Sequence, residues 1–316
     1  MKLATFVAPD GTRRIGALTA DGRRLADLTA SDADPAFADM LALIDAGADG
    51  LARARTLAAD PRAVHDLAAV KLLAPIPVPR RMRDCLCFEK HFRQSKANRW
   101  LFGQGTARLD PATVDIPKVW YARPLYYKGN PFSVVGTDAE VHWPKYSQTI
   151  DYELELAVVM GKSGVDIPVE RALEHAFGFT IFNDFSARDA QYIEMAAGLG
   201  PGKGKDFDTG NAMGPCIVTR DEIADPYALA MRVSVNGRVR SETVSGGMQH
   251  DIARCIAFVS QSETLHPGEV LAMGTVGNGC GYESLTFLDD GDVVEIEVEG
   301  IGRLRNRLVK APGNTQ

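Results

Sequence analysis

The sequence of 316 residues lacks several features that would point directly to a function. It has no apolar run approaching the ~20 residues of a membrane-spanning helix. Its first residues become polar too soon for a signal peptide. It has no block of lysine and arginine, and its net charge of -6 argues against a nucleic-acid groove and a membrane-surface helix. We therefore expect a cytoplasmic protein with no nucleic-acid partner and no membrane partner.

The chain also lacks the glycine pattern of a nucleotide-binding loop. No Gly-x-Gly-x-x-Gly follows a predicted strand, and the segment Gly202 to Lys205 has the wrong spacing for a phosphate loop. Cysteines are few: five scattered residues, an odd number that indicates reduced thiols in a cytoplasmic protein. Cys85 and Cys87 do not have the spacing of a zinc knuckle, so we interpret both as packing residues.

Composition and turn residues predict the domain organisation. The hydrophobic share of 45% and the charged share of 24% are typical of a globular protein. Turn dipeptides at 10–11 and 21–22 divide residues 2–30 into the short runs of a β meander, and helical spacing follows over 35–70. Residues 71–83 carry three prolines in five positions, which indicates an extended connector. We therefore predict a small N-terminal α+β domain at 1–72 and a catalytic domain at 73–316.

The second part is predicted to be rich in strands. There is no regular alternation of strands and helices of the kind that builds a parallel sheet. The candidate strands are 132–136, 150–160, 179–183, 215–219, 230–235, 269–273 and 292–298, and the candidate helices lie near 169–175, 186–196 and 248–261.

Acidic and apolar residues alternate at the start of the candidate strand 150–160. An extended strand would place Asp151, Glu153 and Glu155 on one face, where like charges repel. A hard cation removes this penalty, because carboxylate oxygens are the ligands that Mg²⁺, Mn²⁺ and Ca²⁺ prefer. A solvated edge strand with two surface glutamates explains the stretch equally well, so the rest of the chain has to decide.

A third carboxylate and a histidine strengthen the metal hypothesis. Asp184 stands at the end of an apolar strand, and Ser186 after it is a good N-cap for a helix that begins at residue 187. With Glu153 and Glu155, Asp184 matches a Mg²⁺ site that keeps positions open for water or substrate. His91 is a natural proton acceptor near pH 7, although a lone histidine is more often structural.

Several motifs in a fixed order resemble the fumarylacetoacetate hydrolase family over roughly residues 75 to 305. The most specific are the Asp-Tyr-Glu-Leu-Glu-Leu strand at 151–156 and Asn-Asp-Phe-Ser-Ala-Arg-Asp-x-Gln at 183–191. The others are Asp84 seven residues before His91, Tyr126 to Gly129, Gly204-Lys205-x-Phe207 and Gly274-Thr275. The resemblance implies a mixed β-sandwich roll of the α+β class, rich in β structure, and a homodimer.

The resemblance also implies roles for individual residues. The metal ligands would be Asp84, Glu153, Glu155 and Asp184, holding Mg²⁺ first, with Mn²⁺ and Ca²⁺ as alternatives. His91 would be the general base, oriented by Glu283, and Lys205 would lie beside the metal. Substrate contacts would come from Arg188, Gln191, Tyr127 and Thr275. Ion pairs within their own segments are alternatives for two of these: Lys205 with Asp206 or Asp208, and Arg188 with Asp189 or Glu194.

The chain departs from the family pattern at two places. Gln94 stands three residues after His91, where short-chain members have a glutamate. No arginine lies where fumarylacetoacetase has its substrate-binding arginine, and Trp100 is nearby instead.

Together these features predict a hydrolase that cleaves a carbon–carbon bond in a 1,3-diketo acid derived from aromatic-ring catabolism. His91 would activate water, and the metal would chelate the substrate enolate. The same machinery also serves isomerases or tautomerases, hydratases and decarboxylases of 2-oxo acids. A binding module for a metal or a small ligand is the non-catalytic alternative.

Overall fold

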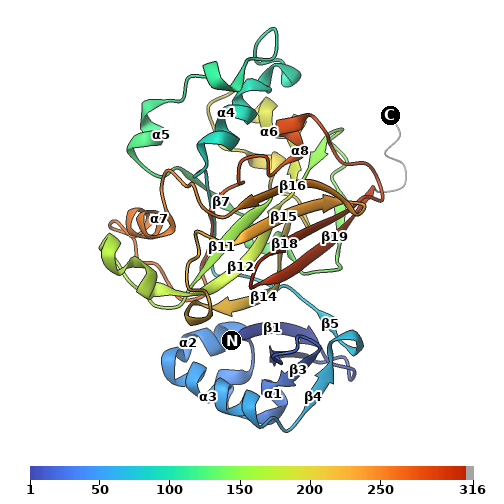
Figure 1. Cartoon of the computed structure of the whole chain (residues 1–316), viewed down its shortest axis with the longest axis vertical. Coiled ribbons are helices and arrows are strands. Elements are labelled where there is room, and N and C mark those ends of the chain that lie inside the picture. The colour runs from blue at the N-terminus through green and yellow to red at the C-terminus, as the bar shows by residue number, and fades with distance from the viewer. Residues whose placement is uncertain (311–316) are drawn as a thin grey trace.

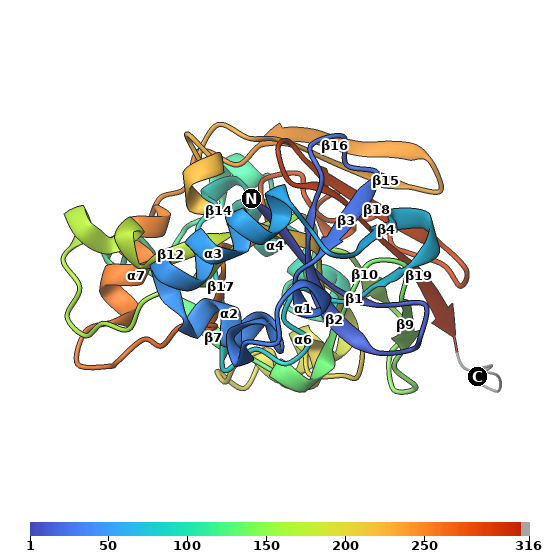
Figure 2. The same cartoon turned by 90° about the horizontal axis from the view of Figure 1, so that it is seen from below.

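The computed structural model describes residues 1–310 of the chain. Residues 2–27 form the predicted meander, in which β1 (Lys2–Val7), β2 (Arg13–Leu18) and β3 (Arg24–Asp27) pair antiparallel in chain order. The short helix α1 (Leu28–Ser31) follows. Helices α2 (Met40–Asp45) and α3 (Gly47–Ala59) then lie under the face of a large sheet (Figures 1 and 2). Their apolar residues share one core with β12 (Ala176–Asp184) and β14 (Asn211–Thr219) of that sheet.

The large sheet continues from the N-terminal segment into the rest of the chain. β1 pairs with β14, where Lys2 lies opposite Val218. The predicted connector therefore does not separate two sheets, and the domain boundary at 72/73 stays a prediction. The strand order is β4-β3-β2-β1-β14-β12-β11-β17-β6-β7. The remaining bounds are β4 Val64–Asp66, β5 Lys71–Leu72 beside β1, β6 Met82–Cys85, β7 Tyr126–Gly129, β8 Val134–Val135 beside β14, β11 Glu155–Met160, β12 Ala176–Asp184, β14 Asn211–Thr219 and β17 Val270–Ala272.

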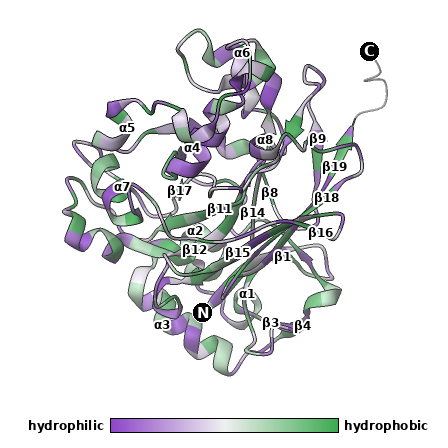
Figure 3. Cartoon of the chain, turned by 45° about the horizontal axis from the view of Figure 1, so that its top comes forward, coloured by the Kyte–Doolittle hydropathy of each residue, from purple (hydrophilic) through white to green (hydrophobic). Residues whose placement is uncertain are grey.

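A second sheet covers the other face. Its order is β16-β15-β18-β19-β9, with β9 Glu140–Trp143, β15 Ala230–Val235, β16 Arg238–Val244, β18 Val293–Val298 and β19 Gly302–Lys310. Val233 and Ile296 of this sheet share the main core with Val158 and Ile181 of the large sheet. Apolar residues concentrate on β11 and β12 between the layers (Figure 3). This arrangement confirms the predicted β-rich α+β sandwich.

Short helices gather at the end of the sandwich opposite the N-terminal segment (Figure 1). They are α4 Glu89–Ala97, α5 Lys118–Ala122, α6 Arg188–Met195 and α8 Gly281–Ser284, whereas α7 Ile252–Val259 lies at the side. The predicted helix 186–196 begins two residues late. Ser186 does not cap it, because Ser186 lies in β13 (Ser186–Ala187), which pairs with β10 (Ile150–Asp151), and its hydroxyl donates to Asp184 O.

The predicted continuous strand 150–160 is wrong. β10 ends at Asp151, β11 begins at Glu155, and Glu153 between them makes an isolated bridge to Cys280. The carboxylate of Asp151 accepts backbone N–H groups of Gly281 and Tyr282, at 2.8 and 2.9 Å. These bonds hold Asp151 at the turn into α8 and interrupt the strand, although oxygens of Glu153 and Glu155 still lie within 4.8 Å of each other.

The central strand β12 leaves no room for a side chain at Gly178. A Cβ atom there would lie 2.2 Å from Val218 O and 2.8 Å from Ile217 Cγ2. We expect Gly178→Ala to lower the free energy of unfolding by about 1–3 kcal/mol, because β12 and β14 would have to separate. Urea denaturation measures this change. Gly200→Ala is the control, since no atom lies within 4 Å of its added Cβ. Equal midpoints for the two variants would contradict the packing described.

Candidate active site

Four carboxylates meet at the end of the large sheet that carries the short helices. Asp84 lies in β6, Glu155 begins β11, and Asp184 ends β12, while Glu153 stands just before β11. All four are buried. Oxygens of Asp84, Glu153 and Glu155 lie within 4.8 Å of one another. The sheet therefore brings together side chains that are up to 100 positions apart in the chain.

Lys205 and Tyr127 connect Asp184 to this group. Lys205 Nζ donates to Glu153 Oε2 and Asp184 Oδ2, each at 2.6 Å. The Tyr127 hydroxyl is shared between Asp84 Oδ2, at 3.0 Å, and Asp184 Oδ2. The alternative pairing of Lys205 with Asp206 or Asp208 is therefore not what the structure shows. Three of the predicted ligands, Asp84, Glu153 and Glu155, thus line one space, and Lys205 and Tyr127 join the fourth, Asp184, to them.

The electrostatics of this space show a shortage of positive charge. Burial, together with the Asp184 carboxylate, raises the pKa of Asp84 well above its usual value. Burial and the neighbouring carboxylates do the same for the pKa of Glu155. Burial opposes ionisation of Glu153 too, but the charges of Lys205 and Arg188 outweigh it and lower its pKa to about 2. Two carboxylates thus stay hard to ionise until another cation arrives.

Unpaired oxygens indicate where a cation would bind. Asp84 Oδ1 and Asp184 Oδ1 are buried, and neither has a hydrogen-bond partner among residues 1–310. An unpaired buried polar atom costs about 1–3 kcal/mol, so such atoms usually mark an ion or a water molecule. Carboxylate oxygens are the ligands of hard divalent cations. The residues present therefore fit a divalent metal.

A histidine–carboxylate pair lies beside the carboxylate cluster. His91 of α4 places Nδ1 3.0 Å from Glu283 Oε1 of α8, and Ser95 Oγ is 3.4 Å from His91 Nε2. The second oxygen of Glu283 accepts the Cys280 N–H at 3.1 Å, which fixes the carboxylate. The structure thus brings Glu283 to the position expected of the residue that orients His91. Gln94 points elsewhere, since its amide donates to Asn278 at 2.7 Å.

Arg188 is held mainly by two carboxylates from outside its own helix. Its guanidinium donates to Asp151 Oδ2 at 2.7 and 2.9 Å and lies 2.7 Å from Glu153 Oε1. The suggested pairs with Asp189 and Glu194 are therefore not formed. Arg188 also donates to Gln191 Oε1 at 3.0 Å, which leaves the Gln191 amide nitrogen for other contacts.

Sequence reasoning assigned no role to Asp151. Its carboxylate links Arg188, β10 and α8, and it is fully buried. Because Asp151 alternates with Glu153 and Glu155, the sequence suggested only that it lies on the same strand face as they do. Nothing in the local sequence indicates that its carboxylate binds the N–H groups of Gly281 and Tyr282 in α8. Thr275, a predicted pocket residue, lies beside Glu155 and donates to Glu155 Oε1 at 3.2 Å.

A cavity of about 230 Å³ opens onto this cluster and is lined by His91, Lys205, Gln191, Tyr127 and Thr275. Arg99 lines it as well, and sequence reasoning missed this residue, which directly precedes Trp100. Arg99 Nε is buried with no hydrogen-bond partner among residues 1–310, and the guanidinium carbon lies 5.8 Å from the centre of the Tyr192 ring. The cavity therefore contains a cation with hydrogen-bonding capacity to spare.

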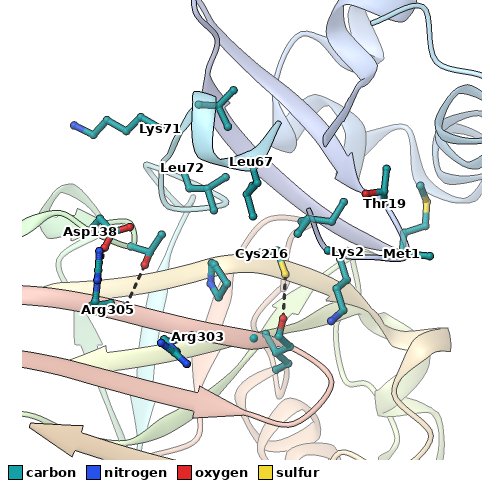
Figure 4. A pocket seen from close by; sticks show the side chains of 18 of the residues that line it. Met1, Lys2, Thr19, Leu67, Lys71, Leu72, Asp138, Cys216, Arg303 and Arg305 are labelled. Carbon is teal, nitrogen blue, oxygen red and sulfur yellow. Dashed lines mark hydrogen bonds and ion pairs between the residues drawn. The ribbon is translucent and has the colours of Figure 1, made fainter. Parts of the chain in front are cut away.

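A larger cavity, about 1100 Å³, lies elsewhere, between the meander and the sheets (Figure 4). Its two arginines already have acidic partners: Arg305 pairs with Asp138, and Arg303 lies 3.3 Å from Glu295. We place the active site at the smaller cavity. Of the cavities described for residues 1–310, it alone is lined by both His91 and the buried carboxylates.

A β-rich fold that gathers carboxylates, a lysine and an oriented imidazole around one cavity defines an enzyme with a site for a divalent metal. The family model described as "Fumarylacetoacetate (FAA) hydrolase C-terminal" matches residues 82–309. The chain belongs to this family, as its sequence motifs predict.

Individual relatives are informative about activity. The mitochondrial oxaloacetate tautomerase fahd2 of Xenopus laevis is 31% identical over 98% of this chain and 90% of its own length. The oxaloacetate tautomerase YisK of Bacillus subtilis is 34% identical over 78% of this chain and 75% of its own. Among solved structures, the 5-carboxymethyl-2-hydroxymuconate delta-isomerase of Mycobacterium smegmatis has a TM-score of 0.70 and 27% identity, covering 98% of this chain and 100% of its own.

These names correct the predicted activity. The expectation of a hydrolase that cleaves a carbon–carbon bond of a diketo acid is wrong, because the relatives named above are tautomerases and an isomerase. The error has a physical cause: the same carboxylates and histidine serve either outcome, so the residue types do not distinguish them.

The cellular location stays a prediction. Within residues 1–310, no helix combines the length and apolar character needed to cross a membrane. The expected cytoplasmic location is not tested by this, and one relative is described as mitochondrial.

Added Mg²⁺ should stabilise the protein, and more so at higher pH. Raised pKa values mean that folded Asp84 and Glu155 keep protons that the unfolded chain releases above 3.8 and 4.5. Without a cation, stability should therefore fall as pH rises beyond those values. A cation that binds the ionised groups removes this loss. We expect the Mg²⁺-induced rise in Tm over chelator-treated protein to grow from about pH 5 to about pH 8.

Thermal melts of the Glu155→Gln variant provide the comparison with the unmodified protein. This variant should lose most of the Mg²⁺-induced rise in Tm, because it lacks one ligand carboxylate. A Tm that Mg²⁺ leaves unchanged at every pH would contradict the metal assignment.

Proposed function

We propose that this protein is a metal-dependent tautomerase that interconverts the keto and enol forms of a short 2-oxo dicarboxylic acid of the oxaloacetate type. The observation that carries this proposal is the likeness, over 98% of the chain, to a relative named as an oxaloacetate tautomerase. The arrangement of charged groups in the cavity supports it, as follows.

Asp84, Glu153, Glu155 and Asp184 would hold the cation, with Mg²⁺ as the first choice and Mn²⁺ or Ca²⁺ as alternatives. The chemistry that the bound ion supplies is polarisation of the substrate's carbonyl group, which makes the neighbouring C–H acidic. Thr275 and Tyr127 support this role by donating to the ligand carboxylates and so fixing their orientation.

His91 would move the proton at carbon 3 of the substrate. Hydrogen bonding of Nδ1–H to Glu283 selects the tautomer in which Nε2 carries the lone pair, with the Ser95 hydroxyl 3.4 Å from it. In the keto-to-enol direction Nε2 removes a proton from carbon 3. In the reverse direction the imidazolium returns it, and Glu283 stabilises the positive charge meanwhile. No water molecule has to be activated, which distinguishes this reaction from hydrolysis.

Lys205 and Gln191 would face the negative charge that develops on the substrate oxygen. Burial opposes ionisation of Lys205, but Asp184 and Glu153 outweigh it and raise the pKa of the ammonium, so Lys205 stays charged. Gln191 contributes an amide N–H, because its carbonyl oxygen is already used by Arg188. Such prepositioned donors typically contribute about 3–4 kcal/mol each to transition-state stabilisation.

Arg99 would bind the distal carboxylate. A guanidinium with an unpaired buried N–H matches a carboxylate in charge and geometry. The cavity of about 230 Å³ suits a substrate of few atoms. A small dicarboxylate spanning the metal site and Arg99 is therefore the partner we propose. The homodimer suggested by family resemblance stays a prediction.

Mixing the protein and Mg²⁺ with freshly dissolved oxaloacetate should accelerate the change in enol absorbance towards its equilibrium value. Total oxaloacetate should stay constant, because tautomerisation makes no new compound. The His91→Ala variant should lower kcat about 10²–10⁴-fold, the usual contribution of a general base. Its affinity for Mg²⁺ should be unchanged, since His91 is not among the ligands.

Two outcomes would contradict the proposal. Loss of total oxaloacetate with release of pyruvate would indicate a decarboxylase. Unchanged tautomerisation by His91→Ala would show that another group moves the proton.

Arg99→Met tests the distal contact. Loss of a hydrogen bond to a charged group costs about 1.5–3 kcal/mol, so KM for the dicarboxylate should rise by about 10- to 150-fold with little change in kcat. The control is Arg171→Met on the exposed segment Val169–His175, which should keep the KM of the unmodified protein. An Arg99→Met variant with unchanged KM would remove Arg99 from the substrate site.

A further inference from the structure

Three buried thiols lie together outside the carboxylate cluster: Cys85, Cys87 and Cys255. Their sulfur atoms lie within 4.8 Å of one another, and the sulfurs of Cys87 and Cys255 are 3.6 Å apart. Cys85 ends β6, Cys87 follows it by two residues, and Cys255 lies in α7. The interpretation of Cys85 and Cys87 as packing residues is therefore incomplete, because the fold places both beside a third thiol.

We propose that Cys87 and Cys255 are a modification site, at which hydrogen peroxide forms a reversible disulfide bond. A disulfide has an S–S distance of about 2.05 Å, so the two sulfurs must approach by about 1.5 Å. This proposal goes beyond the tautomerase activity and does not rest on it, because the bond is detected chemically.

A disulfide suits this position better than a bound metal ion. The three cysteines belong to the main apolar core of the protein. A divalent ion would need all three cysteines as thiolates and would leave a net negative charge in that core, where an uncompensated charge is costly. Oxidation needs only one thiolate, and only until it reacts with peroxide. The nearby cation Arg83 already pairs with Glu269 at 2.6 Å and with Glu263. A disulfide is neutral and leaves no charge to compensate.

One residue of the cluster borders the active-site cavity, and another is a nucleophile. Cys85 lines the cavity, so peroxide that enters the cavity comes next to the cluster. Hydrogen bonds from the thiols of Cys85 and Cys87 lower the pKa of Cys255 to about 5, although burial opposes this. The thiolate is the form of cysteine that attacks peroxide.

The reaction balances without any further reagent. The Cys255 thiolate attacks one peroxide oxygen and the O–O bond breaks. Hydroxide is the leaving group, and Cys255 becomes a sulfenic acid. The Cys87 sulfur then attacks the sulfenic sulfur, so that the S–S bond forms and the S–O bond breaks with loss of water. The hydroxide takes up the proton that Cys255 had released. Two thiols lose two electrons, and peroxide becomes two molecules of water.

The disulfide would affect the active site through the segment that carries Cys87. This residue lies between Asp84 and His91, and its carbonyl oxygen accepts the Gln249 N–H at 2.8 Å, close to the start of α7. Asp251 caps α7 by accepting the Arg254 N–H, so the helix is anchored. Closing the S–S distance would therefore draw the segment towards α7 and displace Asp84 and His91. Misplacement by about 1 Å can reduce a rate about 10²-fold.

The full-length protein, reduced and loaded with Mg²⁺, is treated with hydrogen peroxide, alkylated and digested for mass spectrometry. We expect a cross-linked peptide pair containing Cys87 and Cys255 that dithiothreitol removes. We also expect a loss of tautomerase rate of at least about 10-fold that dithiothreitol restores. The Cys255→Ser variant should form no such pair and keep its rate after peroxide. The Cys216→Ser variant, which alters a buried thiol outside the cluster, should behave like the unmodified protein.

Peptide mapping of the unmodified protein decides the proposal even if the variants fold poorly. Alkylatable Cys87 and Cys255 after peroxide treatment would overturn it, as would zinc bound to these thiols at one ion per chain. A cross-link that forms in a protein without tautomerase activity would support this site and reject only the proposed function.

Discussion

The structure depends on a shortage of positive charge at one buried point. Four carboxylates converge where strands of the large sheet end, and the buried cations beside them are Lys205 and Arg188. Arg188 is shared with a fifth carboxylate, Asp151. Burying charges without compensation is among the most costly arrangements in a protein. A divalent cation would supply the missing charge; without one, the raised pKa values of Asp84 and Glu155 let protons neutralise these two carboxylates instead.

The fold divides the remaining tasks between its strands and its helices. The strands hold the acidic ligands in a rigid array, since Glu155 and Asp184 lie on paired neighbours in the sheet. The helices carry the groups that handle protons and substrate: His91 on α4, Glu283 on α8 and Gln191 on α6. The carboxylates are therefore fixed by the sheet, whereas a small change in the position of a helix would move the groups that handle protons and substrate. The proposed link between Cys87 and Cys255 would act at this junction.

Much of the site could be predicted from the sequence, because its signals are local. Alternating acidic residues and a carboxylate at a strand end identified Glu153, Glu155 and Asp184, and ordered motifs added Lys205 and His91. Contacts between distant segments could not be predicted in the same way. Strand 150–160 is interrupted because Asp151 binds α8, and Arg99 lines the cavity because of the turn after α4. The type of reaction could not be predicted from the types of residues in the site either. Hydrolysis and tautomerisation use the same residues and differ in whether water reacts.

Crystals soaked in Mn²⁺ would test the metal centre most directly, because its anomalous scattering locates the ion without assumptions about activity. The account predicts a single strong peak between the oxygens of Asp84, Glu153 and Glu155, with Asp184 turned towards it and metal–oxygen distances of about 2.0–2.3 Å. A map with no peak there, and with Lys205 still bridging Glu153 and Asp184, would contradict it. The carboxylates would then be a self-contained ion-pair network rather than a metal site.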